Sequence, residues 1–95
     1  MNEDDFEWDE TKAAMNWKDH GVTFQQAIQV FNDHFAIEWI DDREDYGEER
    51  INRLGMCGGI ILHVTYTERG PRFRIIAARR AEKHEEEDYY RENAF

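Results

Sequence analysis

Arginine side chains concentrate in one short stretch of a chain that is otherwise acidic. Between Arg69 and Arg80 there are five arginines, at positions 69, 72, 74, 79 and 80. The stretch 50–80 holds seven basic residues, all arginine, and one acid, Glu68, in a protein of net charge −10. A guanidinium group is planar and offers paired donors that match a phosphate group. The cluster therefore predicts a local anion site rather than a generally basic surface.

The five arginines lie around the last predicted strand, 72–78. Side chains alternate between the two faces of a strand. One face is expected to carry Arg72, Arg74, Ile76 and Ala78, and the other is expected to point into the core with Phe73, Ile75 and Ala77. Arg79 and Arg80 follow where a helix begins, and free N–H groups at such a junction favour an anion. Ion pairs with 85–87 or 41–49 explain either arginine alone equally well, but the group of five favours a site.

A polar stripe on the first predicted helix is the second candidate for chemistry. Lys12, Asn16 and His20 recur every four residues, so they share one side of a helix. Histidine ionises near working pH and serves as an acid or a base. The stripe either presents a proton-transfer group to the arginines or is a solvated surface, and the pattern alone favours the solvated surface.

The order of helices and strands predicts an α+β fold for a single domain over residues 1–95. A helix is expected from Asp9, a good N-cap, to His20–Gly21, and a second from Thr23 through Phe31, opened by a Thr23–Gln26 capping box. Alternating and apolar runs predict four strands and then a final helix; the strands cover 34–40, 50–55, 60–67 and 72–78. Short turns, including one at 55–59, make the sheet antiparallel.

Composition excludes several classes of protein. One cysteine cannot form an internal disulfide, and Cys57 lacks a CxxC partner. His34, His63 and His84 do not have metal-ligand spacing, so neither a metal nor a cofactor is expected. No apolar run approaches the roughly 20 residues that cross a bilayer, which predicts a cytoplasmic protein without a membrane partner.

Five motifs together resemble those of the BrnT family, the toxin halves of bacterial BrnT–BrnA toxin–antitoxin modules. They are FEWDETK (6–12), NWKDHGVTF (16–24), DYGEER (45–50), YTER (66–69) and RIIAARRA (74–81). The resemblance covers about residues 6–90. It implies a RelE-like fold and a metal-independent ribonuclease that arrests translation. It also implies a hetero-oligomer with a BrnA-like antitoxin that neutralises the activity.

The resemblance also implies which residues act on RNA. Matched motifs contain Lys12, His20, Arg50, Arg69, Arg74, Arg79 and Arg80. In the mechanism we expect, Arg79 and Arg80, with Arg74 or Arg69, hold the scissile phosphate. His20 is the candidate general acid or base, and Lys12 is a phosphate contact or an alternative proton contact. Arg50, Arg72 and Lys18 are expected to bind RNA elsewhere.

A second class of function stays open from the sequence. The arginine face could instead dock an acidic or mixed-charge protein partner in a chain with little or no nuclease activity, and the net charge of −10 favours this reading. Growth arrest on expression of the chain alone would distinguish a toxin from a binding module.

Overall fold

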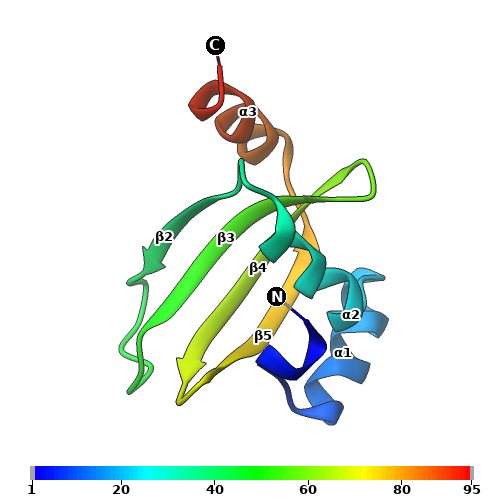
Figure 1. Ribbon diagram of the computed structural model, residues 1–95, viewed down its shortest axis with the longest axis vertical. Helices are drawn as coiled ribbons and strands as arrows, with labels where there is room; N and C mark the ends of the chain where they lie inside the picture. The colour runs from blue at the N-terminus through cyan, green and yellow to red at the C-terminus, as the bar shows by residue number, and fades with distance from the viewer. Residues whose placement is uncertain (1, 95) are drawn as a thin grey trace.

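The computed structural model describes residues 2–94 and has an α+β fold, as predicted. The helices are α1 (Glu10–His20), α2 (Phe24–Ala27) and α3 (Lys83–Glu92), with 3-10 segments η1 (Glu3–Asp5) and η2 (Ile28–Asn32). The strands are β1 (Phe6–Glu7), β2 (Ile37–Asp41), β3 (Arg50–Cys57), β4 (Ile60–Arg69) and β5 (Arg72–Arg80). They form one sheet in the order β1-β5-β4-β3-β2, with α1 and α2 beside β5 and α3 at one end (Figure 1).

The N-terminal helices begin where their capping residues stand. Asp9 accepts a hydrogen bond from the Lys12 N–H, and Gly21 ends α1 with a φ of 66°. Thr23 and Gln26 form the predicted capping box. The second helix is shorter than predicted, because its α-helical part ends at Ala27 and η2 continues it as a 3-10 helix.

The sheet contains the four predicted antiparallel strands and one that was not predicted. β1 has two residues and pairs in parallel with β5, Phe6 beside Phe73 and Glu7 beside Arg74. A two-residue strand is too short to show alternation in the sequence, which is why it was missed. The sheet therefore has five strands rather than four.

The predicted turn at 55–59 is narrower in the structure. β3 runs on to Cys57, and the turn is made by Gly58 and Gly59, both with positive φ. Gly55 lies within β3, where a Cβ atom would come within 2.7 Å of Val30 Cβ. Gly55 thus allows η2 to pack closely against the sheet.

One face of the sheet, the apolar face, packs against α1, α2 and η2. The buried residues of this face and of the helices form one cluster: Phe6, Val22, Phe24, Ala27, Val30, Cys57, Leu62, Val64, Tyr66, Ile75 and Ala78. Tyr66 is buried as expected, and its hydroxyl donates to Glu38 at 2.6 Å at the edge of the cluster. This face supplies the main core.

A β-bulge in β5 corrects the predicted faces of that strand. Tyr66 pairs with Ile75, but the preceding residue Thr65 pairs with Ala77, so Ile76 is an extra residue in β5. Alternation therefore resumes one residue out of step. The prediction that Ala78 lies opposite the core and Ala77 within it was wrong: Ala78 is 1% exposed and belongs to the core cluster.

The other face, the polar face, is covered by α3 at one end. A second cluster of Leu54, Ile61 and Tyr89 packs there, and the Tyr89 hydroxyl donates to Asp33 at 2.6 Å. The final helix begins at Lys83 rather than at Arg79, because β5 extends through Arg80. Beyond α3 no other helix covers this face within residues 2–94 (Figure 1).

Candidate functional site

Two adjoining hollows of about 210 Å³ each lie on the uncovered part of the polar face. Both are lined by Arg43, His63 and Arg79. One extends toward β2 and α3 and adds Trp39, Ile40, Asp41, Asp42, Asn52 and Glu85. The other extends toward α1 and adds His20, Thr65, Ala77 and Ala78. The site therefore combines two arginines, two histidines and side-chain hydroxyl and amide groups at one surface.

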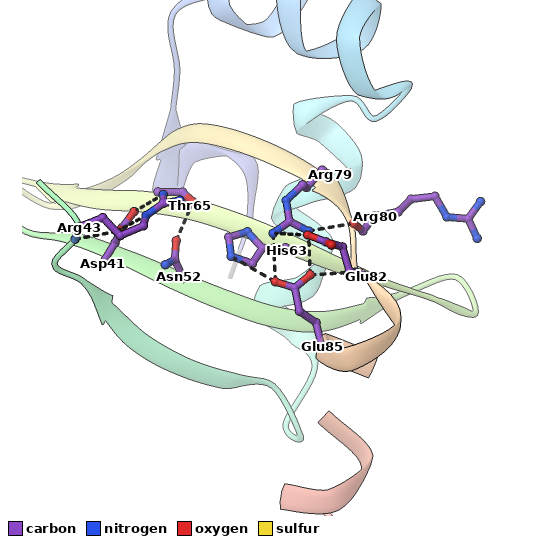
Figure 2. A network of polar contacts seen from close by, with 9 residues as sticks. All are labelled: Asp41, Arg43, Asn52, His63, Thr65, Arg79, Arg80, Glu82 and Glu85. Atoms are coloured by element: carbon purple, nitrogen blue, oxygen red, sulfur yellow. Dashed lines mark hydrogen bonds and ion pairs between the residues drawn. The ribbon is translucent and has the colours of Figure 1, made fainter. Parts of the chain in front are cut away.

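Arg79 lies at the centre of this site because of the β-bulge. After Ile76, Ala77 and Arg79 point to the polar face and pair with Thr65 and His63 on β4. The Arg79 guanidinium donates from Nη1 to Glu85 Oε1 at 2.7 Å and from Nη2 to Glu85 Oε2 at 3.0 Å (Figure 2). The structural alternative weighed above, an ion pair with the acids of the final helix, thus holds for Arg79.

His63 is a partly buried imidazole beside Arg79. Its side chain is 12% exposed, and its Nε2 atom lies 3.9 Å from Glu85 Oε2. Burial lowers the pKa of His63 below its usual 6.5, and Arg79 lowers it further, while Glu85 opposes the change. A lowered pKa favours the neutral imidazole, which is able to accept a proton at pH 7.

Buried polar groups continue the site along β2 and β3. Asp41 has a side chain only 1% exposed and accepts two hydrogen bonds from Arg43, each of 2.8 Å. These bonds lower the pKa of Asp41, so the carboxylate stays charged next to the hollow. Thr65 donates to Asn52 Oδ1 at 2.7 Å. Both pairs are drawn with Arg79 and Glu85 in Figure 2.

The predicted stripe on α1 faces β5, but its three members differ. Asn16 is buried, accepts a hydrogen bond from the Ala78 N–H at 3.0 Å and donates to the Ala78 carbonyl at 2.8 Å. A wholly solvated stripe is therefore wrong. His20, one turn further on, lines the hollow next to Arg79. Lys12 is exposed at the start of the helix and makes no side-chain ion pair within residues 2–94.

The structure separates Arg80 from Arg79. Arg80 pairs with Leu62, so its side chain leaves the strand on the side opposite to Arg79. Figure 2 shows it extending away from the hollow. Arg72 and Lys18 are exposed, on the last turn of the sheet and on α1. These three side chains and that of Arg79 do not converge on one phosphate.

The remaining predicted arginines are paired with acids toward the β4–β5 turn. Arg74 shares the polar face with Arg79 and donates to Glu7 at 2.6 Å. Arg50 and Arg69 both contact Glu48, at 3.3 and 3.5 Å, and Arg50 also lies over the Tyr46 ring. Only Arg79 and His20, of the nine predicted residues, line the hollows.

Sequence reasoning missed His63, which lies between the two hollows. The signal was present, because alternation in 60–67 places His63 and Thr65 opposite the core residues Leu62 and Val64. His63 was considered only as a metal ligand. Glu85 was considered only as one of several acids that could pair with an arginine.

Two absences apply to the part of the chain that the structure describes. In residues 2–94 no group of three or more His, Cys, Asp or Glu side chains is placed to hold a metal ion. Across the same residues, none of the helices is long and apolar enough to span a membrane.

The five mostly antiparallel strands, with helices before and after them, form an α+β fold that is consistent with a RelE-like fold, and the polar face of this sheet carries Arg79 at an open surface. A family model described as the ribonuclease toxin BrnT of type II toxin–antitoxin systems matches residues 8–85. The chain belongs to this family and is a ribonuclease toxin, which implies a cognate antitoxin. No curated protein matches the chain.

Proposed function

We propose that this toxin cleaves RNA without a metal ion, in the two hollows of the polar face, and so arrests translation in the cytoplasm. The single toxin domain spans residues 1–95 in this proposal. The observation that carries it is the juxtaposition of Arg79 with two histidines, His63 and His20, around one open surface. These groups match what a phosphoryl transfer from the 2′-hydroxyl requires: a base, an anion-binding group and an acid.

His63 takes the proton from the 2′-hydroxyl in this mechanism. Its lowered pKa keeps the imidazole neutral and its position beside Arg79 places it next to the bound phosphate. The 2′-oxygen then bonds to phosphorus, and Arg79 donates hydrogen bonds to the negative oxygens of the crowded intermediate. As the bond from phosphorus to the 5′-oxygen breaks, His20 supplies the proton that this leaving oxygen needs.

The other predicted cations hold the RNA on either side. Arg74 lies on the same face as Arg79 and pairs with Thr67, four residues along β4 from His63, or about 13 Å away at the usual rise of a strand. Arg50, Arg69 and Arg72 lie in the same direction, toward the β4–β5 turn. Lys12, Lys18 and Arg80 lie outside the hollows. In this proposal they contact phosphates further along the RNA, where each adds affinity without acting on the cleaved bond.

A BrnA-like protein is the proposed antitoxin, bound to this chain as a hetero-oligomer that covers Arg79. Expression of the chain alone in bacteria is expected to stop growth, and co-expression of the adjacent gene product is expected to restore it. Healthy growth in both cultures would contradict the proposal.

The chemistry is tested with purified protein and a short RNA in the presence of EDTA. We expect cleavage to continue and to leave a 2′,3′-cyclic phosphate, because the nucleophile is the 2′-oxygen of the substrate. An otherwise identical RNA with a single 2′-deoxy nucleotide at the cleaved position serves as the control and is expected to stay intact. A 5′-phosphate on the downstream product, or loss of activity in EDTA, would overturn the mechanism.

A further inference from the structure

Glu85 lies where Arg79, His63 and the start of α3 meet. Its side chain is 9% exposed and accepts hydrogen bonds from both terminal nitrogens of Arg79, at 2.7 and 3.0 Å. Its Oε1 atom also accepts from the Glu82 N–H at 2.8 Å, and its Oε2 atom lies 3.9 Å from His63 Nε2. One buried carboxylate is thus shared between the arginine and the histidine of the proposed mechanism.

The pairing with Glu85 occupies the edge of the Arg79 guanidinium that is formed by Nη1 and Nη2, and it does not use the edge that contains Nε. Nη1 and Nη2 are held by Glu85, and Nη1 also donates to the Arg80 carbonyl at 3.2 Å. The Nε–H of Arg79 makes no hydrogen bond with any residue from 2 to 94. A guanidinium binds an anion with two parallel hydrogen bonds along either edge. The Glu82 carboxylate lies 3.8 Å from Nη2, and its side chain is 65% exposed. A phosphate at the Nε edge therefore binds Nε and competes with this exposed carboxylate for Nη2.

The fixed orientation matters because Arg79 is a long side chain at an open surface. Its side chain is 33% exposed, so without a partner it would sample several rotamers. Burial by itself raises the pKa of Glu85, but the hydrogen bonds from Arg79 and from the Glu82 N–H outweigh this effect and lower it. The carboxylate therefore stays charged at neutral pH and keeps both of its acceptor oxygens.

We propose that Glu85 is a positioning residue of the ribonuclease reaction, whose carboxylate holds Arg79 so that the Nε edge receives the scissile phosphate. The inference rests on the proposed role of Arg79 in cleavage. A purely structural role is the competing explanation, because Glu85 also completes the capping box of α3. Glutamine satisfies a capping box as well as glutamate does, which separates the two roles.

Glu85→Gln is therefore the informative substitution. The glutamine keeps the volume and the cap but has an NH₂ group in place of one oxygen, so the two parallel hydrogen bonds from Nη1 and Nη2 to separate oxygens are lost. We expect kcat to fall about 10-fold or more, because the guanidinium is no longer fixed. We expect KM to stay the same or decrease, because the loss of one negative charge favours RNA.

Glu86→Gln is the matched control, since Glu86 is exposed on the same turn of α3 and the substitution removes the same charge. We expect its kcat to remain within about twofold of the wild type. If Glu85→Gln behaves like Glu86→Gln, or raises KM with kcat unchanged, the positioning role is wrong. If instead Arg79→Lys has normal kcat, the proposed role of Arg79 itself fails, so the two failures are distinguishable.

A measurement on the wild-type protein tests the same inference if Glu85→Gln does not fold. The Nε–Hε resonance of Arg79 is followed by NMR while a 2′-O-methyl oligonucleotide, which has no free 2′-hydroxyl, is added. We expect this resonance to shift on binding. An unchanged Nε–Hε resonance in a protein saturated with the oligonucleotide overturns the inference.

Discussion

The two faces of the sheet differ in what covers them, although the same strands build both. On the apolar face Leu62 and Val64 are fully buried under α2 and η2. On the polar face the neighbouring residues of the same strand, His63 and Thr65, line open hollows. Because successive side chains of a strand point to opposite faces, ten residues of β4 serve both the core and the proposed active site.

The β-bulge in β5 places apolar side chains on the core side of the sheet and Arg79 on the polar face. If Ile76 were paired like its neighbours instead of bulged, strict alternation from Phe73 and Ile75 would place Ala77 and Arg79 on the apolar face. With the extra residue, Ala78 fills the core and Arg79 reaches the hollows. The apolar face thus specifies stability and the polar face specifies chemistry, and substitutions on each face test this separation.

The largest expected effect is on the apolar face, at Leu62. Leu62→Ala removes a side chain that is 0% exposed and leaves a cavity, so we expect the free energy of unfolding to fall by about 2–5 kcal/mol. Chemical denaturation measures this change. Ile40→Ala is the control, because Ile40 is 49% exposed, and it should change stability by no more than about 0.5 kcal/mol. If both substitutions lowered the free energy of unfolding equally, the claim that the buried residues of the apolar face specify stability would be wrong.

Arg79→Lys, on the polar face, should have the opposite effect to Leu62→Ala: a large loss of kcat and a small loss of stability. Lysine keeps a positive charge next to Glu85 but lacks the two-pronged donor, so we expect kcat to fall about 100-fold, equivalent to about 2.7 kcal/mol of transition-state stabilisation. The free energy of unfolding should fall by no more than about 1 kcal/mol. Cleavage of a short RNA and chemical denaturation of the same sample give both values. A stability loss without a loss of kcat would assign Arg79 to the structure rather than to the reaction.

Asn16 lies between the apolar core and the proposed active site. Its side chain fixes α1 to the backbone of β5 at Ala78, next to Arg79. Asn16→Ala leaves the buried N–H and carbonyl groups of Ala78 without their side-chain partner, and we expect a loss of stability of about 1–3 kcal/mol. Met15→Ala, at a position 53% exposed on the same helix, is the control. If the two variants unfold at the same denaturant concentration, the Asn16 contacts contribute nothing to the fold.

The smallest expected effect is in the pH dependence of the reaction. Since burial and Arg79 both lower the pKa of His63, its neutral form persists below pH 6.5, and less than about half of the activity should be lost between pH 7.5 and pH 6.5. Arg79, Glu85 and Arg43 are the charged groups that act on this imidazole. The profile of kcat/KM against pH measures the pKa of the catalytic base. An acidic limb with its midpoint above pH 6.5 would exclude His63 as the base.

Local signals in the sequence were enough for most of the fold. Asp9, Gly21 and Thr23 cap helices where predicted, because caps depend on residues three or four apart. The bulge at Ile76 was not predictable, because it depends on pairing with β4. The strand β1 was missed because two residues are too few to show alternation, so that only its pairing with β5 defines it.

The candidate site was partly predictable. The arginine cluster pointed to the strand that carries Arg79. The spacing of Asn16 and His20 placed both on one side of α1, but the pattern alone favoured a solvated surface there, whereas Asn16 is buried and His20 lines a hollow. Which arginine enters the hollow depends on the register of β5, so Arg79 and Arg80 could not be told apart. The pairing of Arg79 with Glu85 depends on where α3 begins, which the glutamate-rich sequence from 82 to 87 left open.

The most direct test of the central claim is to map where RNA binds on the protein. A 2′-O-methyl oligonucleotide is added to the ¹⁵N-labelled toxin, and the backbone amide shifts of all assigned residues are followed by NMR. The account predicts the largest changes on the polar face, at residues such as Asn52, Thr65 and Ala77. Changes concentrated on the opposite side, around Gln25 and Gln29 of α2 and η2, would contradict it.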